Sequence, residues 1–220
     1  MSAWPRVRIK ICCIQSIEEA QIAITSGASA LGLVSKMPSG PGVITNDAIR
    51  TIASAIPPGV ATFLLTSSQE AAEIVRQQRT FCVNTLQLVD SVSLDTYKTL
   101  RAELPGISLV QVIHVAGGQS IHEAVEVSRF VDALLLDSGN PKAQIKMLGG
   151  TGRTHDWNIS RSIRAAVKIP VFLAGGLNPE NVRSAIEQVA PFAVDVCSGV
   201  RTNGQLDKDK VRRFIQNATG

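Results

Sequence analysis

The sequence predicts an α/β fold in which eight parallel strands close into a (β/α)8 barrel, also called a TIM barrel. Short apolar, β-rich runs alternate with helical segments along all 220 residues, and this alternation is typical of a parallel sheet. Eight such strand–helix units fill the chain without a linker or a low-complexity stretch, and eight repeats favour closure over an open sheet. We therefore expect one domain over residues 1–220.

The first unit shows how each element is recognised. Residues 8–12 alternate polar and apolar side chains, as a strand with one buried face does. Ser16 is a good N-cap and Glu19 completes a capping box, so a helix is expected from there to about Ser26, where Gly27 ends it. The same criteria predict strands over 30–35, 60–66, 84–89, 108–115, 131–136, 171–173 and 192–196, and helices over 46–56, 69–78, 94–103, 120–129, 160–168, 180–189 and 208–217.

The composition excludes several classes of protein. With 45% hydrophobic and 18% charged residues the chain is typical of a globular protein, and its net charge of +4 is mild. Aromatic residues make up only 4%, and the Lys and Arg residues are scattered, so nucleic acid is not an expected partner. No apolar run is long enough to cross a bilayer, and residues 1–8 lack the apolar core of a signal peptide. These features predict a cytoplasmic protein with no membrane partner.

The four cysteines show no spacing typical of a metal site or a disulfide framework: they are Cys12, Cys13, Cys82 and Cys197. The sequence contains no other signal for a metal or an organic cofactor, so we predict neither.

Two glycine-containing strand ends near the C-terminus predict a phosphate site. Gly175 and Gly176 follow an apolar run, and Asn178-Pro179 then has the pattern of an N-cap and a first helical residue. About twenty residues later, Ser198-Gly199 ends a second apolar run. Glycine lets backbone N–H groups approach an anion, and barrels of this type bind phosphate after strands seven and eight. Tight turns without a ligand are the alternative reading, but two matched turns favour phosphate.

The connection over 138–158 is long, and long ordered loops in compact domains are usually functional. It contains Gly150-Thr151-Gly152, which we expect to fold over the sugar of a phosphosugar ligand.

Strand alternation predicts which side chains enter the barrel. Apolar residues belong under the helices, which turns the intervening polar side chains inward. The inward set is then Lys10, Cys12, Gln87, Asp137, Asp195 and Cys197, while Cys13 is expected to face away from the lumen. A buried lysine must be paired, and Asp195 is on the neighbouring strand after closure. That pair is as consistent with a structural role as with a functional one, and a buried cysteine such as Cys12 often acts only as a small apolar residue.

Several motifs in the same order resemble the phosphoribosylanthranilate isomerase family, a (β/α)8 barrel of the ribulose-phosphate-binding type from tryptophan biosynthesis. The matching segments are KIC at 10–12, LLDS at 135–138, GGTGRTHDW at 149–157, LAGGLNPENV at 173–182 and DVCSGV at 195–200. The family catalyses an Amadori rearrangement of a phosphorylated N-ribosyl amine, as an intramolecular oxidoreductase of the aldose–ketose isomerase class. The resemblance makes Asp137 the general acid and Cys12 the general base.

Three departures concern the aromatic-acid side of the site. Cys13 stands where the family has glycine, Pro41 where it has an arginine that holds the anthranilate carboxylate, and Val89 where it has histidine. The resemblance therefore implies a divergent member whose aromatic-acid side is altered. His114, at the end of strand five, is either a new polar contact to the substrate or a hydrogen-bonded strand-end residue.

Three functions remain open at this stage. The first is an isomerase acting on phosphoribosylanthranilate or a closely related N-ribosyl amine. The second is a paralogous barrel enzyme that uses the same acid and base on another phosphosugar, and the third is a phosphosugar-binding barrel without catalysis. The expected partner is a small phosphosugar in each case, and the chain is expected to be a monomer or a homodimer.

Overall fold

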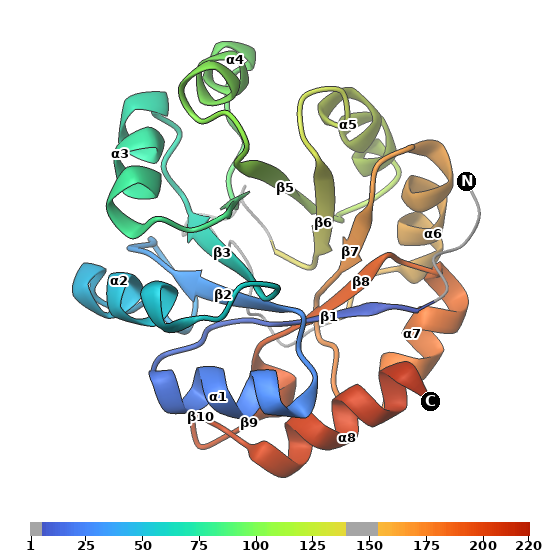
Figure 1. Ribbon diagram of the computed structural model, residues 1–220. Helices are drawn as coiled ribbons and strands as arrows, with labels where there is room; N and C mark the ends of the chain where they lie inside the picture. The colour runs from blue at the N-terminus through green and yellow to red at the C-terminus, as the bar shows by residue number, and fades with distance from the viewer. Residues whose placement is uncertain (1–5, 140–153) are drawn as a thin grey trace.

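The computed structural model describes residues 6–139 and 154–220, and these form a closed barrel of eight parallel strands surrounded by helices (Figure 1). The strands are β1 (Arg8–Ile11), β2 (Ala30–Val34), β3 (Ala61–Thr66), β4 (Thr85–Leu88), β5 (Ser108–His114), β6 (Ala133–Asp137), β7 (Val171–Leu173) and β8 (Ala193–Val196). The helices are α1 (Ile17–Ser26), α2 (Asn46–Ala55), α3 (Ala71–Phe81), α4 (Leu94–Glu103), α5 (Gln119–Val127), α6 (Trp157–Ala166), α7 (Val182–Val189) and α8 (Lys208–Thr219). The predicted fold class is thus confirmed.

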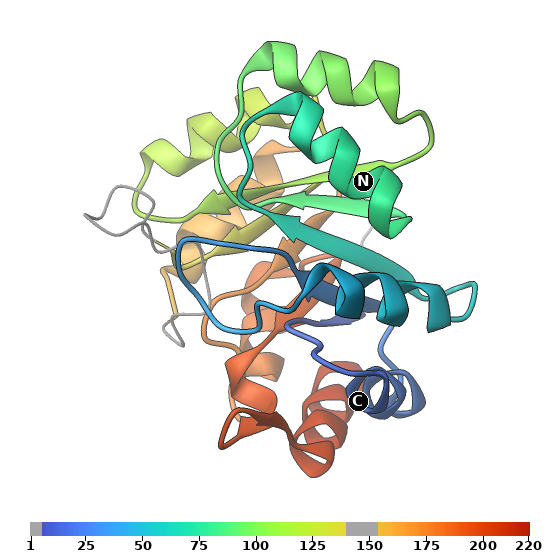
Figure 2. The ribbon, with the colours of Figure 1, turned by 90° about the vertical axis from the view of Figure 1, so that its left-hand side faces the viewer.

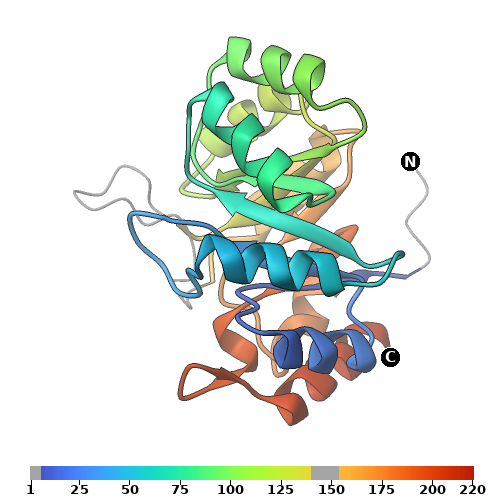
Figure 3. The ribbon, with the colours of Figure 1, turned by 60° about the vertical axis from the view of Figure 1, so that its left-hand side comes forward.

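The barrel closes where β1 pairs with β8. Lys10 is in register with Asp195, and Ile11 with Val196, so the first and last strands of the barrel are direct neighbours. Outside the strands, α8 packs beside α1, and Figures 2 and 3 show these two helices together. Closure therefore brings residues from opposite ends of the sequence to one place at the barrel mouth.

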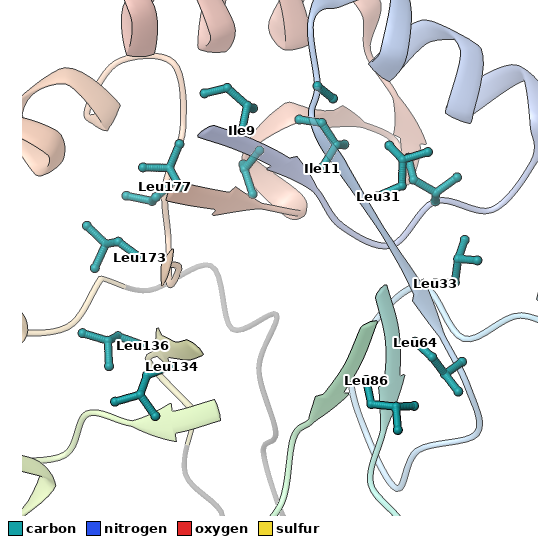
Figure 4. Close-up of a cluster of buried hydrophobic side chains, with 14 of the residues drawn as sticks. Ile9, Ile11, Leu31, Leu33, Leu64, Leu86, Leu134, Leu136, Leu173 and Leu177 are labelled. Carbon is teal, nitrogen blue, oxygen red and sulfur yellow. The ribbon is translucent and has the colours of Figure 1, made fainter. Parts of the chain in front are cut away.

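Two apolar layers lie on the two faces of the sheet. Side chains such as Ile9, Ile11, Leu134 and Leu136 project outward from the strands and form the larger core under the helices (Figure 4). A second cluster of aliphatic and aromatic side chains fills the lumen, among them Ala133, Leu135, Phe172 and Ala193. The alternation read from the sequence is therefore confirmed on β1, β6 and β8.

Four helices, α3, α5, α6 and α7, begin at other residues than predicted. The helix expected over 160–168 begins at Trp157, because the Asp156 side chain accepts the N–H of Asn158 at 2.8 Å and caps it earlier. The helix expected to start at Glu180 begins at Val182. Asn178 does use its side chain as a cap, at 2.9 Å from the N–H of Glu180, but the residues after it form a separate turn.

A short segment after β8 was not predicted. It consists of the 3₁₀ turn η1 (Ser198–Val200) and the hairpin of β9 (Arg201–Thr202) and β10 (Gln205–Leu206). None of the helices in the described ranges is both long and apolar enough to span a bilayer.

Candidate active site

A pocket opens at the carboxyl ends of the strands, the end at which barrels of this class carry their active sites. Six of the residues predicted from the sequence line it or lie in its floor: Cys12, Asp137, Gly175, Gly176, Asp195 and Ser198. They come from the ends of β1, β6, β7 and β8, so barrel closure gathers them. Within residues 6–139 and 154–220, no three His, Cys, Asp or Glu side chains are grouped to hold a metal ion.

Lys10 lies fully buried below the pocket and forms the predicted ion pair. Its Nζ is 3.0 Å from Oδ1 of Asp195, and the two side chains are 0% and 8% exposed. Burial tends to lower the pKa of Lys10, but the charge of Asp195 leaves the pKa raised, so the amine stays protonated. A Cβ on Gly32 would stand 3.1 Å from Nζ of Lys10 and 2.7 Å from Sγ of Cys12. The ammonium group and the thiol therefore border the same glycine.

The thiol of Cys12 has an environment that favours its ionised form. A hydrogen bond from Cys13 and the positive charge of Lys10 hold the pKa of Cys12 below its ordinary value, against the opposite effect of burial. Thiolate is the form of cysteine that acts as a base or a nucleophile, so this environment suits a proton-abstracting role.

The prediction that Cys13 faces away from the lumen is wrong. Its φ of 62° is left-handed, which reverses the direction of the side chain that strand alternation would give. Cys13 lines the pocket, and its thiol contacts those of Cys12 and Cys197, which together with burial raises the pKa of Cys13. The family has glycine at this position, and glycine is the residue that adopts such a φ most easily.

Asp137 ends β6 and points into the lumen as predicted. Burial raises the pKa of its carboxyl group, while the N–H of Ser138, at 2.7 Å from Oδ1, acts in the opposite direction. A raised pKa increases the fraction of carboxylic acid, the form that donates a proton.

The two glycine-containing turns lie next to each other above the strands. Gly175 and Gly176 have φ values of 80° and 64°, which exposes their backbone to the pocket without a side chain. Gly199 fits because a Cβ there would stand 2.0 Å from the carbonyl oxygen of Leu177. The turns after β7 and β8 thus pack directly on each other beside Ser198. The predicted loop contacts Gly150, Thr151 and Gly152 lie outside the described residues.

Gln87 and His114 are inside the barrel but do not belong to the described wall of this pocket. His114 donates Nε2–H to the carbonyl oxygen of Val89, at 2.9 Å, so the strand-end alternative is the one observed. Its Nδ1 and Oε1 of Gln87 are nevertheless buried without a hydrogen-bond partner in the described part of the chain. Buried polar atoms in native structures usually have a hydrogen-bond partner, so these two unpaired atoms are available to a bound ligand.

Sequence reasoning did not single out His155. It lies half-buried just before α6, and its Nε2 is 2.6 Å from Oγ of Ser160. Burial lowers its pKa to about 4, with Asp156 acting in the opposite direction, so the imidazole is neutral at pH 7. The sequence pointed to a functional role for His155 only through its place in the motif at 149–157. The spacing of the residues in this motif does not show in which direction the imidazole ring points.

The segment after β2 forms the wall of the pocket opposite the glycine turns. Met37, Ser39, Gly40 and Pro41 line it, so this wall is mainly apolar side chain and backbone. The Sγ of Cys13 lies 3.7 Å from the carbonyl oxygen of Pro41 and fixes the segment to the end of β1.

Comparisons with known proteins agree with this geometry. The family model of N-(5'-phosphoribosyl)anthranilate (PRA) isomerase matches residues 9–217. A protein of Methanocella arvoryzae named N-(5'-phosphoribosyl)anthranilate isomerase is 40% identical, over 95% of this chain and 96% of its own. One from Methanosarcina mazei, named N-(5'-phosphoribosyl)anthranilate isomerase 2, is 37% identical over 96% and 94%.

Solved structures give the same result. The crystal structure of phosphoribosyl anthranilate isomerase from Thermotoga maritima superposes with a TM-score of 0.83 at 34% identity, covering 96% of this chain and 98% of that one. Another, in complex with reduced 1-(o-carboxyphenylamino)-1-deoxyribulose 5-phosphate, has a TM-score of 0.80 at 31% identity with the same coverage. The barrel and the match over nearly its whole length show that this chain belongs to the N-(5'-phosphoribosyl)anthranilate isomerase family.

Proposed function

We propose that the protein converts N-(5'-phosphoribosyl)anthranilate into 1-(o-carboxyphenylamino)-1-deoxyribulose 5-phosphate, as an aldose–ketose isomerase of tryptophan biosynthesis. One observation carries the proposal: a thiol and a carboxyl group face one pocket beside two glycine-containing turns. An Amadori rearrangement needs an acid and a base that act on different atoms of one sugar, and these two groups come from different strands. The names of the relatives support the choice of substrate.

Asp137 acts as the general acid in this proposal. Its carboxyl proton passes to the ring oxygen of the ribose, and the bond between that oxygen and C1′ breaks. The electron pair of the anthranilate nitrogen forms the iminium bond, and the carboxylate of Asp137 remains. The raised pKa of Asp137 supports this assignment because it keeps a proton available.

Cys12 acts as the general base. Its thiolate removes the proton from C2′ of the iminium intermediate, and the electrons of that bond form the enolamine, which tautomerises to the ketose. The lowered pKa of Cys12 supports the assignment, and the ammonium group of Lys10 is the nearby charge that favours the thiolate. Asp195 holds Lys10 in place through their ion pair.

The phosphate group of the substrate is assigned to the turns after β7 and β8. Backbone N–H groups of Gly175, Gly176, Ser198 and Gly199 would donate to it, and Gly150-Thr151-Gly152 would cover the sugar. We also assign Gln87 and His114 as contacts to the substrate, since each has a buried polar atom without a hydrogen-bond partner in the described part of the chain. No nucleic acid, membrane, metal or cofactor enters this scheme. We also infer a cytoplasmic location and a monomer or homodimer, and light scattering decides between these; a Thermotoga maritima relative is described as dimeric.

The test is a direct assay of the purified protein on freshly prepared phosphoribosylanthranilate, with complementation of an isomerase-deficient tryptophan auxotroph. Cys12→Ser and Asp137→Asn should each lower kcat at least about 100-fold, the usual scale for a general acid or base. Both side chains lie at open strand ends, so circular dichroism and thermal unfolding should stay close to those of the wild type. Unchanged turnover by both variants would show that the assigned chemistry is wrong.

A further inference from the structure

His155 is a half-buried residue with a buried ring nitrogen that the mechanism above does not use. It comes immediately before the N-cap of α6, and its ring reaches back toward the end of β6. One ring nitrogen, Nε2, is hydrogen-bonded to Ser160, whose side chain is fully buried in the first turn of α6. The other, Nδ1, is buried and has no hydrogen-bond partner in the described part of the chain. Most buried polar atoms have a hydrogen-bond partner, so the surroundings of this nitrogen indicate what it binds.

The hydrogen bond between Nε2 of His155 and the hydroxyl group of Ser160 can run in either direction, depending on the tautomer of the ring. A neutral imidazole that accepts from Ser160 at Nε2 carries its proton on Nδ1, and in this tautomer the orphaned atom is a donor.

Gly175 shows what this donor faces. A Cβ on Gly175 would stand 2.9 Å from Nδ1 of His155 and 3.2 Å from Oδ1 of Asp137. The imidazole and the carboxyl group therefore both approach the backbone of Gly175 closely, which is allowed because residue 175 has no side chain. Among the described residues, Oδ1 of Asp137 accepts from the N–H of Ser138 at 2.7 Å and from its hydroxyl group at 3.5 Å.

We propose that His155 is a positioning residue that donates its Nδ1–H to the carboxylate of Asp137 after Asp137 has given its proton to the ring oxygen. This inference rests on the proposed function, in which Asp137 is the acid. The donor forms its hydrogen bond fully only to the charged carboxylate, so it stabilises the product of proton transfer more than the starting acid. Ser160 contributes by donating to Nε2, which places the ring proton on Nδ1, and Gly175 contributes by letting the ring and the carboxyl group lie on either side of its backbone.

The experiment compares His155→Leu, which removes the donor, with His155→Asn, whose amide nitrogen takes about the place of Nδ1. The readout is the pKa of Asp137 in the free enzyme, followed by NMR of ¹³C-labelled aspartate and assigned with Asp137→Asn. A donor to the charged form lowers a carboxyl pKa, so His155→Leu should raise it by about one unit. We expect kcat to fall about tenfold in His155→Leu and to recover largely in His155→Asn.

An unchanged Asp137 titration in folded His155→Leu would overturn the inference, even if activity falls. A rise in KM with no change in that titration would do the same, since His155 would then contact substrate directly. Should His155→Leu not fold, Ser160→Ala replaces it, because loss of the fixed tautomer should move the same pKa in the same direction. Retained activity in Asp137→Asn would instead reject the proposed function, while the titration would still report on the contact between His155 and Asp137.

Discussion

Cys13 contributes a hydrogen bond to Cys12 from an unfavourable backbone conformation. Its left-handed φ of 62° costs free energy that glycine would not. The bond from its thiol is the largest cause that lowers the pKa of Cys12. The conformation is thus coupled to the reactivity of the neighbouring residue.

Cys13→Gly should therefore raise the pKa of Cys12, although it relieves the backbone. Alkylation of Cys12 by iodoacetamide, followed by mass spectrometry as a function of pH, measures this pKa because thiolate is the reacting form. The profile should move to higher pH in Cys13→Gly and much less in Cys13→Ser, whose hydroxyl still donates. Identical profiles for Cys13→Gly and the wild type would show that Cys13 does not lower the pKa of Cys12 and that Lys10 alone does so.

Alternation along the strands was sufficient to predict the side chains that meet in the lumen. Lys10, Cys12, Asp137 and Asp195 follow from a period of two together with barrel closure. Cys13 and His155 could not be predicted, because a positive φ and the direction of a ring outside regular structure leave no periodic trace in the sequence.

At the scale of whole elements, a buried ion pair connects α1 to the segment after β8. Both guanidinium nitrogens of Arg201 lie 2.8 Å from the carboxylate oxygens of Glu19, and both side chains are less than 10% exposed. Arg201 also donates to the carbonyl oxygen of Cys13. Glu19, predicted only as part of a capping box, therefore supports the end of β1 that carries the thiols.

Glu19→Ala should lower the free energy of unfolding by about 3–5 kcal/mol, because it leaves Arg201 buried without a counter-ion. The control is Glu103→Ala, since the pair of Glu103 with Arg79 is half exposed and should contribute about 1 kcal/mol or less. Urea denaturation at pH 7 measures both. Equal losses of unfolding free energy in the two variants would show that burial does not increase the contribution of the Glu19–Arg201 pair to stability.

The same pair has a pH dependence of defined sign. Burial tends to raise the pKa of Glu19, but hydrogen bonds from Arg201 and from the N–H of Gln15 leave it lowered. Its contribution is therefore present above the unfolded pKa of about 4.3 and is lost as pH falls through the lower folded value. The stability difference between the wild type and Glu19→Ala should accordingly shrink below about pH 4.

Periodicity and capping residues predicted the order of the main elements, but not every boundary. The start of α6 depends on which Asx residue forms the cap, here Asp156, whereas α7 begins after Asn181, whose side chain makes no capping hydrogen bond. The β9–β10 hairpin has only two residues in each strand, too few for a recognisable pattern.

For the molecule as a whole, Lys10 and Asp195 connect the first strand of the barrel to the last. Lys10→Met should destabilise the protein by about 3–5 kcal/mol, since Asp195 would remain buried and unpaired. Lys10→Met combined with Asp195→Leu should recover much of that loss, because an apolar pair can replace a buried ion pair. We expect a single urea transition in each case, as for one cooperative domain.

This comparison also separates stability from catalysis. The double variant should remain poorly active, because it lacks the charge that favours the Cys12 thiolate. A double variant as unstable as Lys10→Met would show that an apolar pair cannot replace the ion pair. A wild-type urea transition in two steps would show that the barrel does not unfold as one cooperative domain.

Closure between β1 and β8 has a consequence for synthesis of the chain. The bond from Lys10 to Asp195 spans 185 residues, so at 5–20 residues per second the ribosome needs roughly 10–40 s to supply the counter-ion after β1 has emerged. During that interval β1 presents an open parallel edge and the lumen side chains have no closed barrel around them. A nascent chain stalled before β8 should therefore aggregate more readily than the closed barrel, which sedimentation of stalled ribosome–nascent chain complexes would measure.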